Sequence, residues 1–363
     1  MERRLAYANS KGLFVMLFLA WGGKRAGEEA AKTWLDFPND EARLRYARYV
    51  VGRFSAYNAG FCVAGEWDIA GGDAKQEAFV RALGQHVYEH EPHGRLITLH
   101  ASPNGKDGGS VKRFADEAWM SLADFRNGYD NLHAGMLAAR RGDKPVVSAG
   151  YGYFFGEKNT DAPANSRTID DLRHATWDIV MTGGSFVTGF RGTVRGGKGD
   201  PGAFNPDDPR HAVWLAQLKH LRTLFLKLVP EDGKHMRGQW DWLRQGDALV
   251  SSPLGRGKDA VEERGALGPP PHAYWSLYKD GFGHTQVVYV RGYDGAYTIR
   301  VDDDRKEPLE AVRGRVYSVR RFDLRTGEYA REKDHHGDGP LSLTPPDKQD
   351  WVFVIKRENP YQY

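Results

Sequence analysis

A carboxylate follows an apolar stretch in the first fifth of the chain. Residues 59–64 have strand character, the stretch stops at Gly65, and Glu66, Trp67 and Asp68 come next. A parallel strand that is buried on both faces reads as such an apolar run, and barrel enzymes place their chemistry at the carboxyl ends of these strands. Glu66 is therefore the first candidate for a catalytic acid. A solvated loop glutamate is the alternative.

Strands and helices alternate through the first two thirds of the chain. Six stretches of strand character are each followed by or end in polar or aromatic residues, namely 13–19, 59–64, 95–100, 119–123, 144–149 and 185–190. Segments with helical spacing of apolar residues lie among them, at 40–54, 74–89, 129–141 and 169–181, and another covers 214–228. This alternation predicts crossover units and a parallel α/β barrel of the TIM type. Six strands are two fewer than a closed eight-stranded barrel has.

The pattern changes at about residue 237. Short alternating segments, separated by turn residues at regular intervals, continue from there to the end of the chain. Such spacing is typical of a small antiparallel β-sandwich. We therefore expect a barrel domain over residues 1–236 and a β-sandwich domain over residues 237–363.

Several motifs occur in an order seen in one family. They are Gly65-Glu66-Trp67-Asp68, residues 96–100, 119–127 and 144–147, and the glycine-rich segment 185–189. In this the chain resembles the apiosidase-like glycoside hydrolases, which pair a catalytic barrel with a C-terminal sandwich often labelled a collagen-binding domain. The resemblance implies a retaining glycoside hydrolase, with Glu66 as the acid/base at the end of the fourth barrel strand. A retaining enzyme needs a second carboxyl group about 5 to 5.5 Å away as the nucleophile.

The nucleophile position departs from the family pattern. In the resembling families a glutamate follows the strand that begins Lys-Pro-Val-Val, and Gly150 stands at that place here. A glycine cannot attack an anomeric carbon. Glu157 could replace the missing group if its loop folds back into the barrel mouth, but a solvated loop charge is the alternative. Without a replacement, the chain would bind sugar and turn it over poorly, as a non-catalytic carbohydrate-binding protein on a glycosidase scaffold.

Two more departures concern Gly65 and the start of the chain. Family members commonly carry Asn where Gly65 stands, so one hydrogen-bond donor to a sugar hydroxyl would be absent. Met1 enters at about the helix before the third barrel strand, so the first two strand–helix units would be missing. An open sheet leaves two unpaired edges. Either the sequence is truncated, or another chain or an altered fold closes these edges.

Other residues at or near strand ends are candidates for holding the sugar. A ring could stack on a sugar, or a polar atom could hold a hydroxyl, at His100, Trp119, Tyr151 and Tyr153, and Trp67 and Asp68 lie beside Glu66. Each could equally serve in packing. Asp124 and His133 are weaker candidates, because a helix surface would explain them as well.

Two motifs that suggest metal binding are set aside, and no metal or cofactor is expected. His86, Glu89 and His90 match the His-x-x-Glu-His spacing of some zinc peptidases. They come at the end of a predicted helix, on the side of the barrel away from the chemistry, so a chance match is favoured. Residues 302–304 are three aspartates that could hold calcium, but a solvated hairpin explains them.

Composition restricts the partners. A formal net charge of +3 gives no electrostatic signature for nucleic acid, and no membrane partner is expected. The single Cys62 cannot form an intramolecular disulfide, so the redox compartment is undetermined. Residues 13–20 superficially resemble a signal peptide, yet a strand is favoured there. A secreted or periplasmic location is therefore implied by the family resemblance alone.

Overall fold

The chain divides into two compact units. The first comprises Met1–Gly128, Ala134–Tyr151 and Gly184–Thr188, and the second comprises Tyr129–His133, Gly152–Gly183 and Gly189–Tyr363. The computed structural model describes residues 1–21, 37–68, 74–100, 110–126, 132–139, 144–150, 167–187, 204–205, 207–228, 250–252, 255–256, 272–280, 283–292, 294–300, 315–337 and 340–358. The domain boundary expected between residues 236 and 237 lies outside these ranges and stays a prediction.

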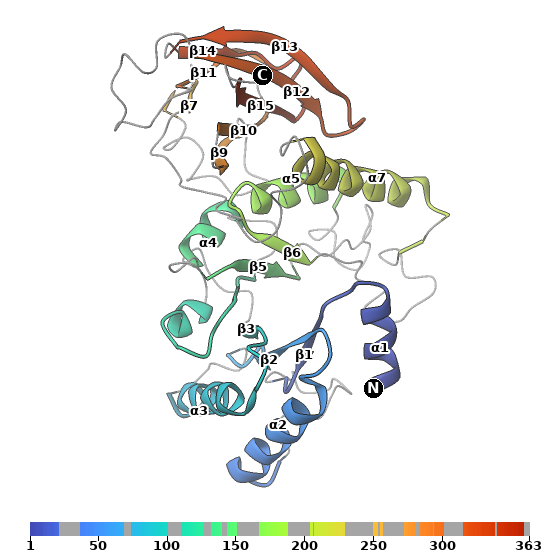
Figure 1. The fold of residues 1–363 in the computed structure, drawn as a ribbon, viewed down its shortest axis with the longest axis vertical. Coiled ribbons are helices and arrows are strands. Elements are labelled where there is room, and N and C mark those ends of the chain that lie inside the picture. The colour runs from blue at the N-terminus through green and yellow to red at the C-terminus, as the bar shows by residue number, and fades with distance from the viewer. Residues whose placement is uncertain are drawn as a thin grey trace, which may run out of the picture. The chain divides into compact units, whose positions relative to one another are not determined.

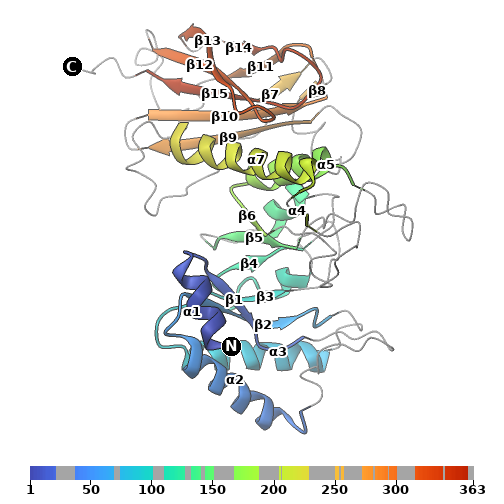
Figure 2. The same cartoon turned by 90° about the vertical axis from the view of Figure 1, so that its right-hand side faces the viewer.

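The first unit is built on a curled, open sheet of six parallel strands (Figures 1 and 2). The strands are neighbours in chain order: β1 (Val15–Phe18), β2 (Ala59–Gly65), β3 (Ile97–His100), β4 (Ala123–Asp124), β5 (Val146–Ala149) and β6 (Ser185–Val187). Every pairing is parallel. The predicted α/β fold with a partial TIM-type barrel is therefore confirmed.

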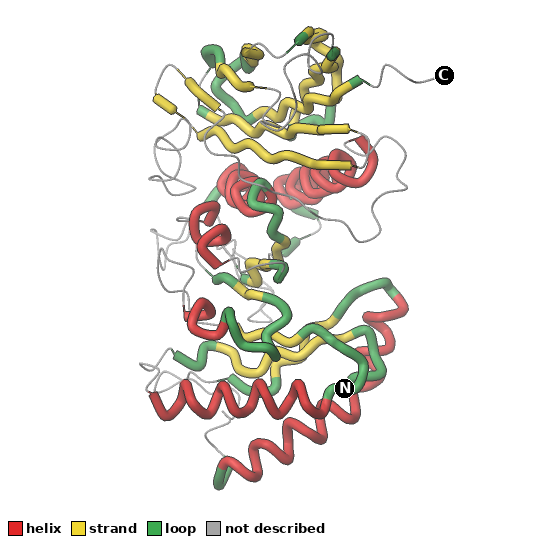
Figure 3. Tube along the Cα trace, turned by 60° about the vertical axis from the view of Figure 1, so that its left-hand side comes forward, coloured by secondary structure: helices red, strands yellow, loops and turns green. Residues whose placement is uncertain are grey.

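Helices connect these strands. They are α1 (Glu2–Ser10), α2 (Asp40–Phe54), α3 (Ala74–His90), the 3₁₀ helix η2 (Ser110–Phe114) and α4 (Leu132–Ala139). The two long helices α2 and α3 lie side by side below the strands in Figure 3. The side chain of Asn39 caps α2 by accepting a hydrogen bond from the Ala42 amide at 2.9 Å.

Helix α3 packs against β2 and β3 and against α2, and β2 is buried throughout. In α2 the buried residues Ala47, Val50, Val51 and Phe54 recur at helical spacing. Gly84 of α3 lies against the ring of Trp119. A Cβ added at Gly84 would lie 2.3 Å from this ring, so the ring occupies the space that a side chain there would need. Glycine at this position therefore gives an aromatic ring its place in the core.

The second unit contains two antiparallel sheets and two helices. A five-stranded sheet has the order β13-β12-β15-β10-β9, and a four-stranded sheet has the order β14-β11-β7-β8. The strands are β7 (Val250–Ser252), β8 (Gly255–Arg256), β9 (His272–Asp280), β10 (Gly283–Arg291), β11 (Tyr297–Arg300), β12 (Val316–Asp323), β13 (Tyr329–His336), β14 (Pro340–Leu343) and β15 (Trp351–Arg357). The predicted C-terminal antiparallel β-structure is confirmed.

The helices of this unit are α5 (Ile169–Val180), α7 (Pro209–Thr223) and the π-helical turn η4 (Leu224–Leu228). Helix α7, which covers much of the segment predicted as a helix over 214–228, belongs to the same unit as α5 and the antiparallel sheets. Among the helices in the described residues, none combines the length and the apolar character that crossing a membrane requires.

A buried ion pair joins α5 to the five-stranded sheet. Arg173 of α5 donates from Nε and Nη2 to the two carboxylate oxygens of Asp350, at 2.7 and 2.8 Å. The Arg173 side chain is 2% exposed and that of Asp350 is 0% exposed. Next to them, Trp177 of α5 stacks on Tyr289 of β10, with ring centroids 5.5 Å apart. Charge pairing and ring stacking thus fix the same helix to the sheet.

The ionisation of this network favours the folded state at neutral pH. Burial opposes the ionised form of Asp350, but hydrogen bonds from His174 and Arg173 outweigh it and hold the pKa of the Asp350 carboxyl well below its usual value. Burial also lowers the pKa of His174. Both groups bind fewer protons in the folded chain than in the unfolded chain, so their contribution to stability falls as the pH drops. The loss begins below about pH 6.5 for His174 and below about pH 4 for Asp350.

We predict that Asp350→Ala lowers the free energy of unfolding of the second unit by about 3 to 5 kcal/mol, because it leaves Arg173 buried and unpaired. The matched control is Asp334→Ala, which removes an exposed pair with Arg331 and should cost at most about 1 kcal/mol. Urea unfolding at pH 7 and at pH 4 measures both variants. Equal losses for the two variants at pH 7 would contradict the assignment of a stabilising buried pair.

Candidate active site

Four residues at the carboxyl ends of neighbouring strands form one row across the sheet. Trp21, just after β1, pairs with Gly65 of β2, Gly65 pairs with His100 of β3, and His100 pairs with Asp124 of β4. In a parallel sheet all carboxyl ends lie at one edge, so residues in register meet there. Glu66 follows this row directly.

The backbone of Glu66 is held in an unusual conformation. Its φ is +47°, and among the described residues no other non-glycine residue has a positive φ. Its amide donates to the carbonyl oxygen of His100 at 2.6 Å, which fixes the chain as it leaves β2. A non-glycine residue in the left-handed region costs on the order of 1 to 3 kcal/mol, and such strain concentrates at functional sites.

The carboxylate of Glu66 is bound from two sides. Trp21 Nε1 donates to Oε2 at 3.2 Å, and the Arg126 guanidinium pairs with Oε1. The side chains of Glu66 and Arg126 are 14% and 15% exposed, so this ion pair is largely shielded from water. A carboxylate has about four lone-pair sites, and these contacts use two of them. Within the described part of the chain, these two contacts leave other lone pairs of the carboxylate able to accept a proton.

Gly65 makes room for the indole of Trp21. A Cβ at position 65 would lie 2.5 Å from the Trp21 ring, closer than two carbon atoms can approach. The sequence comparison suggested that a hydrogen-bond donor is missing at Gly65. The structure adds that an indole occupies the space that any side chain at position 65 would require, and that this indole carries its own N–H to the neighbouring carboxylate.

A second carboxylate supports the row from β4. His100 Nδ1 lies 2.6 Å from Asp124 Oδ2, and the other oxygen of Asp124 accepts from the Ala149 amide at 3.0 Å. The rings of Phe18 and Trp21 pack on the His100 imidazole, with centroids 5.3 and 5.7 Å from it. Asp124 and His100 thereby hold the Trp21 ring, which in turn contacts Glu66.

Cys62 is not a reactive group of this site. It is fully buried in β2, and burial, assisted by the negative charge of Asp124, raises the pKa of its thiol well above the usual value. The thiol therefore stays protonated at neutral pH and is not a nucleophile.

The other predicted site residues fall into three groups. Trp67 and Trp119 are each 1% exposed and pack on Phe114, so their rings fill the core and present no face for a sugar. Asp68 is partly exposed next to Glu66, and His133 is buried in α4. Glu157, Tyr151 and Tyr153 lie outside the described residues, and their roles stay predictions.

Gly150, at the expected nucleophile position, ends β5. Its φ is +94°, and its amide donates to the carbonyl oxygen of Val187 at 2.9 Å. This conformation favours glycine, because the Cβ of any other residue would be strained there. The backbone at position 150 thus has a conformation that suits glycine and disfavours a residue with a carboxylate side chain.

Sequence reasoning missed two partners of Glu66. Neither Trp21 nor Arg126 was among the predicted site residues. The pattern that could have found Arg126 is its position two residues beyond Asp124, at the end of a strand two places along the sheet from β2. No local motif would have paired it with residue 66.

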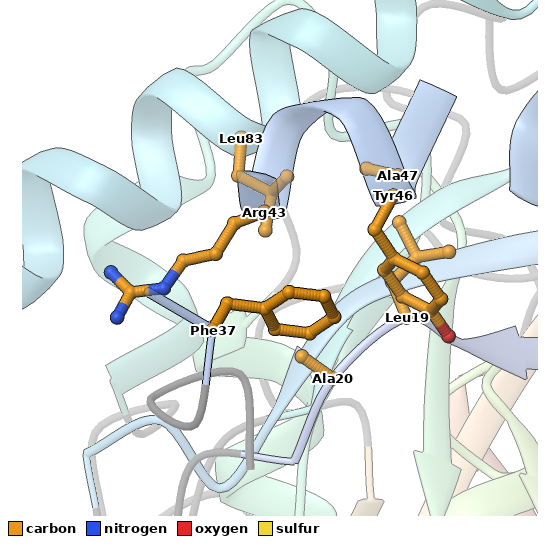
Figure 4. A pocket seen from close by; sticks show the side chains of 7 residues that line it. All are labelled: Leu19, Ala20, Phe37, Arg43, Tyr46, Ala47 and Leu83. Carbon is orange, nitrogen blue, oxygen red and sulfur yellow. The ribbon is translucent and has the colours of Figure 1, made fainter. Parts of the chain in front are cut away.

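A small apolar pocket lies apart from these residues (Figure 4). It is lined by Leu19, Ala20, Phe37, Arg43, Tyr46, Ala47 and Leu83, and it offers about 10 Å³, the space of a single water molecule. None of the predicted catalytic residues lines it. We therefore assign it to imperfect packing of α2 and α3 against β1.

Comparison with solved structures places the fold among the glycoside hydrolases. The crystal structure of a glycoside hydrolase family 5 protein from Bacteroides vulgatus ATCC 8482 matches with a TM-score of 0.67 and 14% identity, over 97% of this chain and 72% of that one. A structure described as a glycoside hydrolase matches with a TM-score of 0.65 and 14% identity, over 97% and 75% of the two chains. No curated protein matches the sequence.

The family is given by the sequence itself. Residues 1–190 match the apiosidase-like catalytic domain, and the chain belongs to this family. The resemblance predicted from the order of the strand-end motifs is thereby confirmed.

We predict that Gly65→Asn, which introduces the residue common in the resembling families, destabilises the first unit by about 1 to 3 kcal/mol, because its Cβ collides with the Trp21 ring. The same change in a Trp21→Ala background should cost less, since the ring is then absent. A double-mutant cycle by urea unfolding measures the coupling. Additive effects of the two substitutions would show that the ring does not restrict position 65.

Proposed function

We propose that the protein is a glycoside hydrolase that cleaves an oligosaccharide or polysaccharide within a retaining framework, with Glu66 as the acid/base. The observation that carries the proposal is the strained Glu66 at the carboxyl end of β2, held by Trp21 and Arg126. Membership of the apiosidase-like family and the glycoside hydrolase fold support it.

Glu66 would give a proton to the oxygen of the leaving group. In the second step it would take a proton from the water that attacks the glycosyl-enzyme intermediate. Arg126 and Trp21 fix the orientation of the carboxylate, because each binds a different one of its two oxygens. Pre-organised hydrogen bonds of this kind lower the reorganisation needed during reaction. His100, which is 4% exposed, is proposed as a positioning residue that supports the Trp21 ring.

The second catalytic group, the nucleophile, is not assigned. Gly150 supplies no attacking side chain, and we keep Glu157 as the candidate that would replace it. If no carboxylate takes this place, the covalent step lacks its nucleophile and the rate falls by orders of magnitude. The second candidate function, a carbohydrate-binding protein on a glycosidase scaffold, is favoured by one observation, the glycine-adapted backbone at Gly150.

We predict slow hydrolysis of aryl glycosides by the natural sequence and a rise on the order of tenfold or more when azide or formate is added, because a small anion can enter the vacant nucleophile position. Glu66→Gln should lower the unaided rate by about 10²- to 10⁴-fold. Initial rates of phenol release, measured over a panel of aryl glycosides, test both statements.

The matched control is Glu41→Gln, a fully solvated glutamate of α2 that should leave the rate unchanged. Fast hydrolysis that does not respond to azide would point to Glu157 as nucleophile, and Glu157→Gln would then abolish it. Sugar binding by calorimetry without turnover would favour the binding protein. Activity that survives Glu66→Gln would refute the role of Glu66.

A further inference from the structure

The last turn of α3 brings three potential metal ligands together. His86, Glu89 and His90 lie on one helix face because their spacing is i, i+3 and i+4. One ligand atom from each lies within 4.8 Å of the others. From the sequence, this motif was set aside as a chance match to a zinc peptidase pattern. The structure adds that the three side chains bring their ligand atoms close together.

Each of the three side chains is already oriented by a neighbour. His90 Nδ1 lies 2.8 Å from the carbonyl oxygen of His86, which places its proton on Nδ1 and leaves the lone pair on Nε2. The ring of His86 is hydrogen-bonded to the backbone of Leu44 in α2. Gln85 donates a hydrogen bond to Glu89 Oε1 at 2.9 Å, so Oε2 is the oxygen that would bind a metal. Metal-binding imidazoles and carboxylates in proteins are held by second hydrogen bonds of this kind.

His86 provides an independent observation that points to a ligand. Its Nε2 is buried and has no hydrogen-bond partner, although a buried polar atom is normally paired. The two imidazole rings face each other with centroids 4.2 Å apart. A cation at the edges of the two rings would take the lone pairs of His86 Nε2 and His90 Nε2.

The surrounding charges favour a cation. The site lies at the carboxyl end of a helix of 17 residues, where the helix dipole stabilises positive charge. The carboxylate of Glu89 attracts a cation to this site. The positive charge of Arg48 in α2 acts in the other direction and repels it. Glu91 is engaged with the amides of His93 and Arg95 and is not available as a ligand.

We propose that His86, Glu89 and His90 bind one divalent cation of the borderline class, Zn²⁺ in the first place. Two imidazoles and a carboxylate with water in the fourth position form a common tetrahedral zinc set. Ligand atoms around tetrahedral zinc are about 3.3 Å apart. Binding would draw the ligand atoms together from their separation within 4.8 Å, mainly through the exposed side chain of Glu89.

The position of this site separates it from the sugar chemistry. α3 ends at His90, before β3 begins, so the cluster lies near the amino end of β3, whereas Glu66 follows the carboxyl end of β2. All three ligands come from α3, and the proposal is independent of the proposed function.

The test uses the full chain, treated with chelator and dialysed, and titrated with ZnCl₂ at pH 7.5 by calorimetry. One equivalent should bind to the natural sequence, and His90→Gln should weaken binding by at least about 10- to 100-fold. The control is His93→Gln, an exposed histidine three residues away that should bind like the natural sequence. MgCl₂ should give no binding heat, since imidazole ligands disfavour magnesium.

Co²⁺ gives a second readout. Intense visible absorption from tetrahedral coordination is expected with the natural sequence and should be lost in His90→Gln. Circular dichroism without metal checks that the variants fold, and His90→Gln with Glu89→Gln keeps the test informative if the partly buried His86 cannot be changed. Unchanged Zn²⁺ affinity in both variants, or the absence of a one-equivalent site, would overturn the proposal.

Discussion

The register of the parallel strands is the constraint on which the site depends. Trp21, Gly65, His100 and Asp124 share one row across four strands, and only this alignment lets a carboxylate on β4 support a ring that contacts Glu66. A slip of one residue in any strand would turn these side chains to the other face of the sheet. Because Gly65 has no side chain, the indole of Trp21 has space to lie against this row.

Polar groups in the two units are held by different means. Around Glu66, two donors from the described residues bind a carboxylate that keeps some access to water. In the second unit, a bidentate arginine binds Asp350, and both side chains are excluded from solvent. The first carboxylate can therefore be reached by a reacting group, whereas the second is shielded from one.

Much of the fold follows from periodicity, and the site follows only in part. The helix over 40–54 and the apolar strand before Gly65 were predicted because burial on one face, or on both, leaves a plain pattern. Strand β13 has an exposed, charged sequence without an apolar face, so no hydrophobic periodicity predicts it. For Trp119 the sequence left sugar stacking and packing equally open, since an aromatic residue near a strand end has the same local pattern in both cases. The pairing of Arg126 with Glu66 joins residues 60 positions apart, which no local pattern reveals.

The central claim is that Glu66 delivers the proton to the departing oxygen. The direct measurement is the dependence of the hydrolysis rate on the acidity of the leaving phenol, in a series of aryl glycosides with azide present, for the natural sequence and for Glu66→Gln. The account predicts a steeper dependence in the variant, with a large loss for poor leaving groups and little loss for good ones. An equal loss across the series would contradict it.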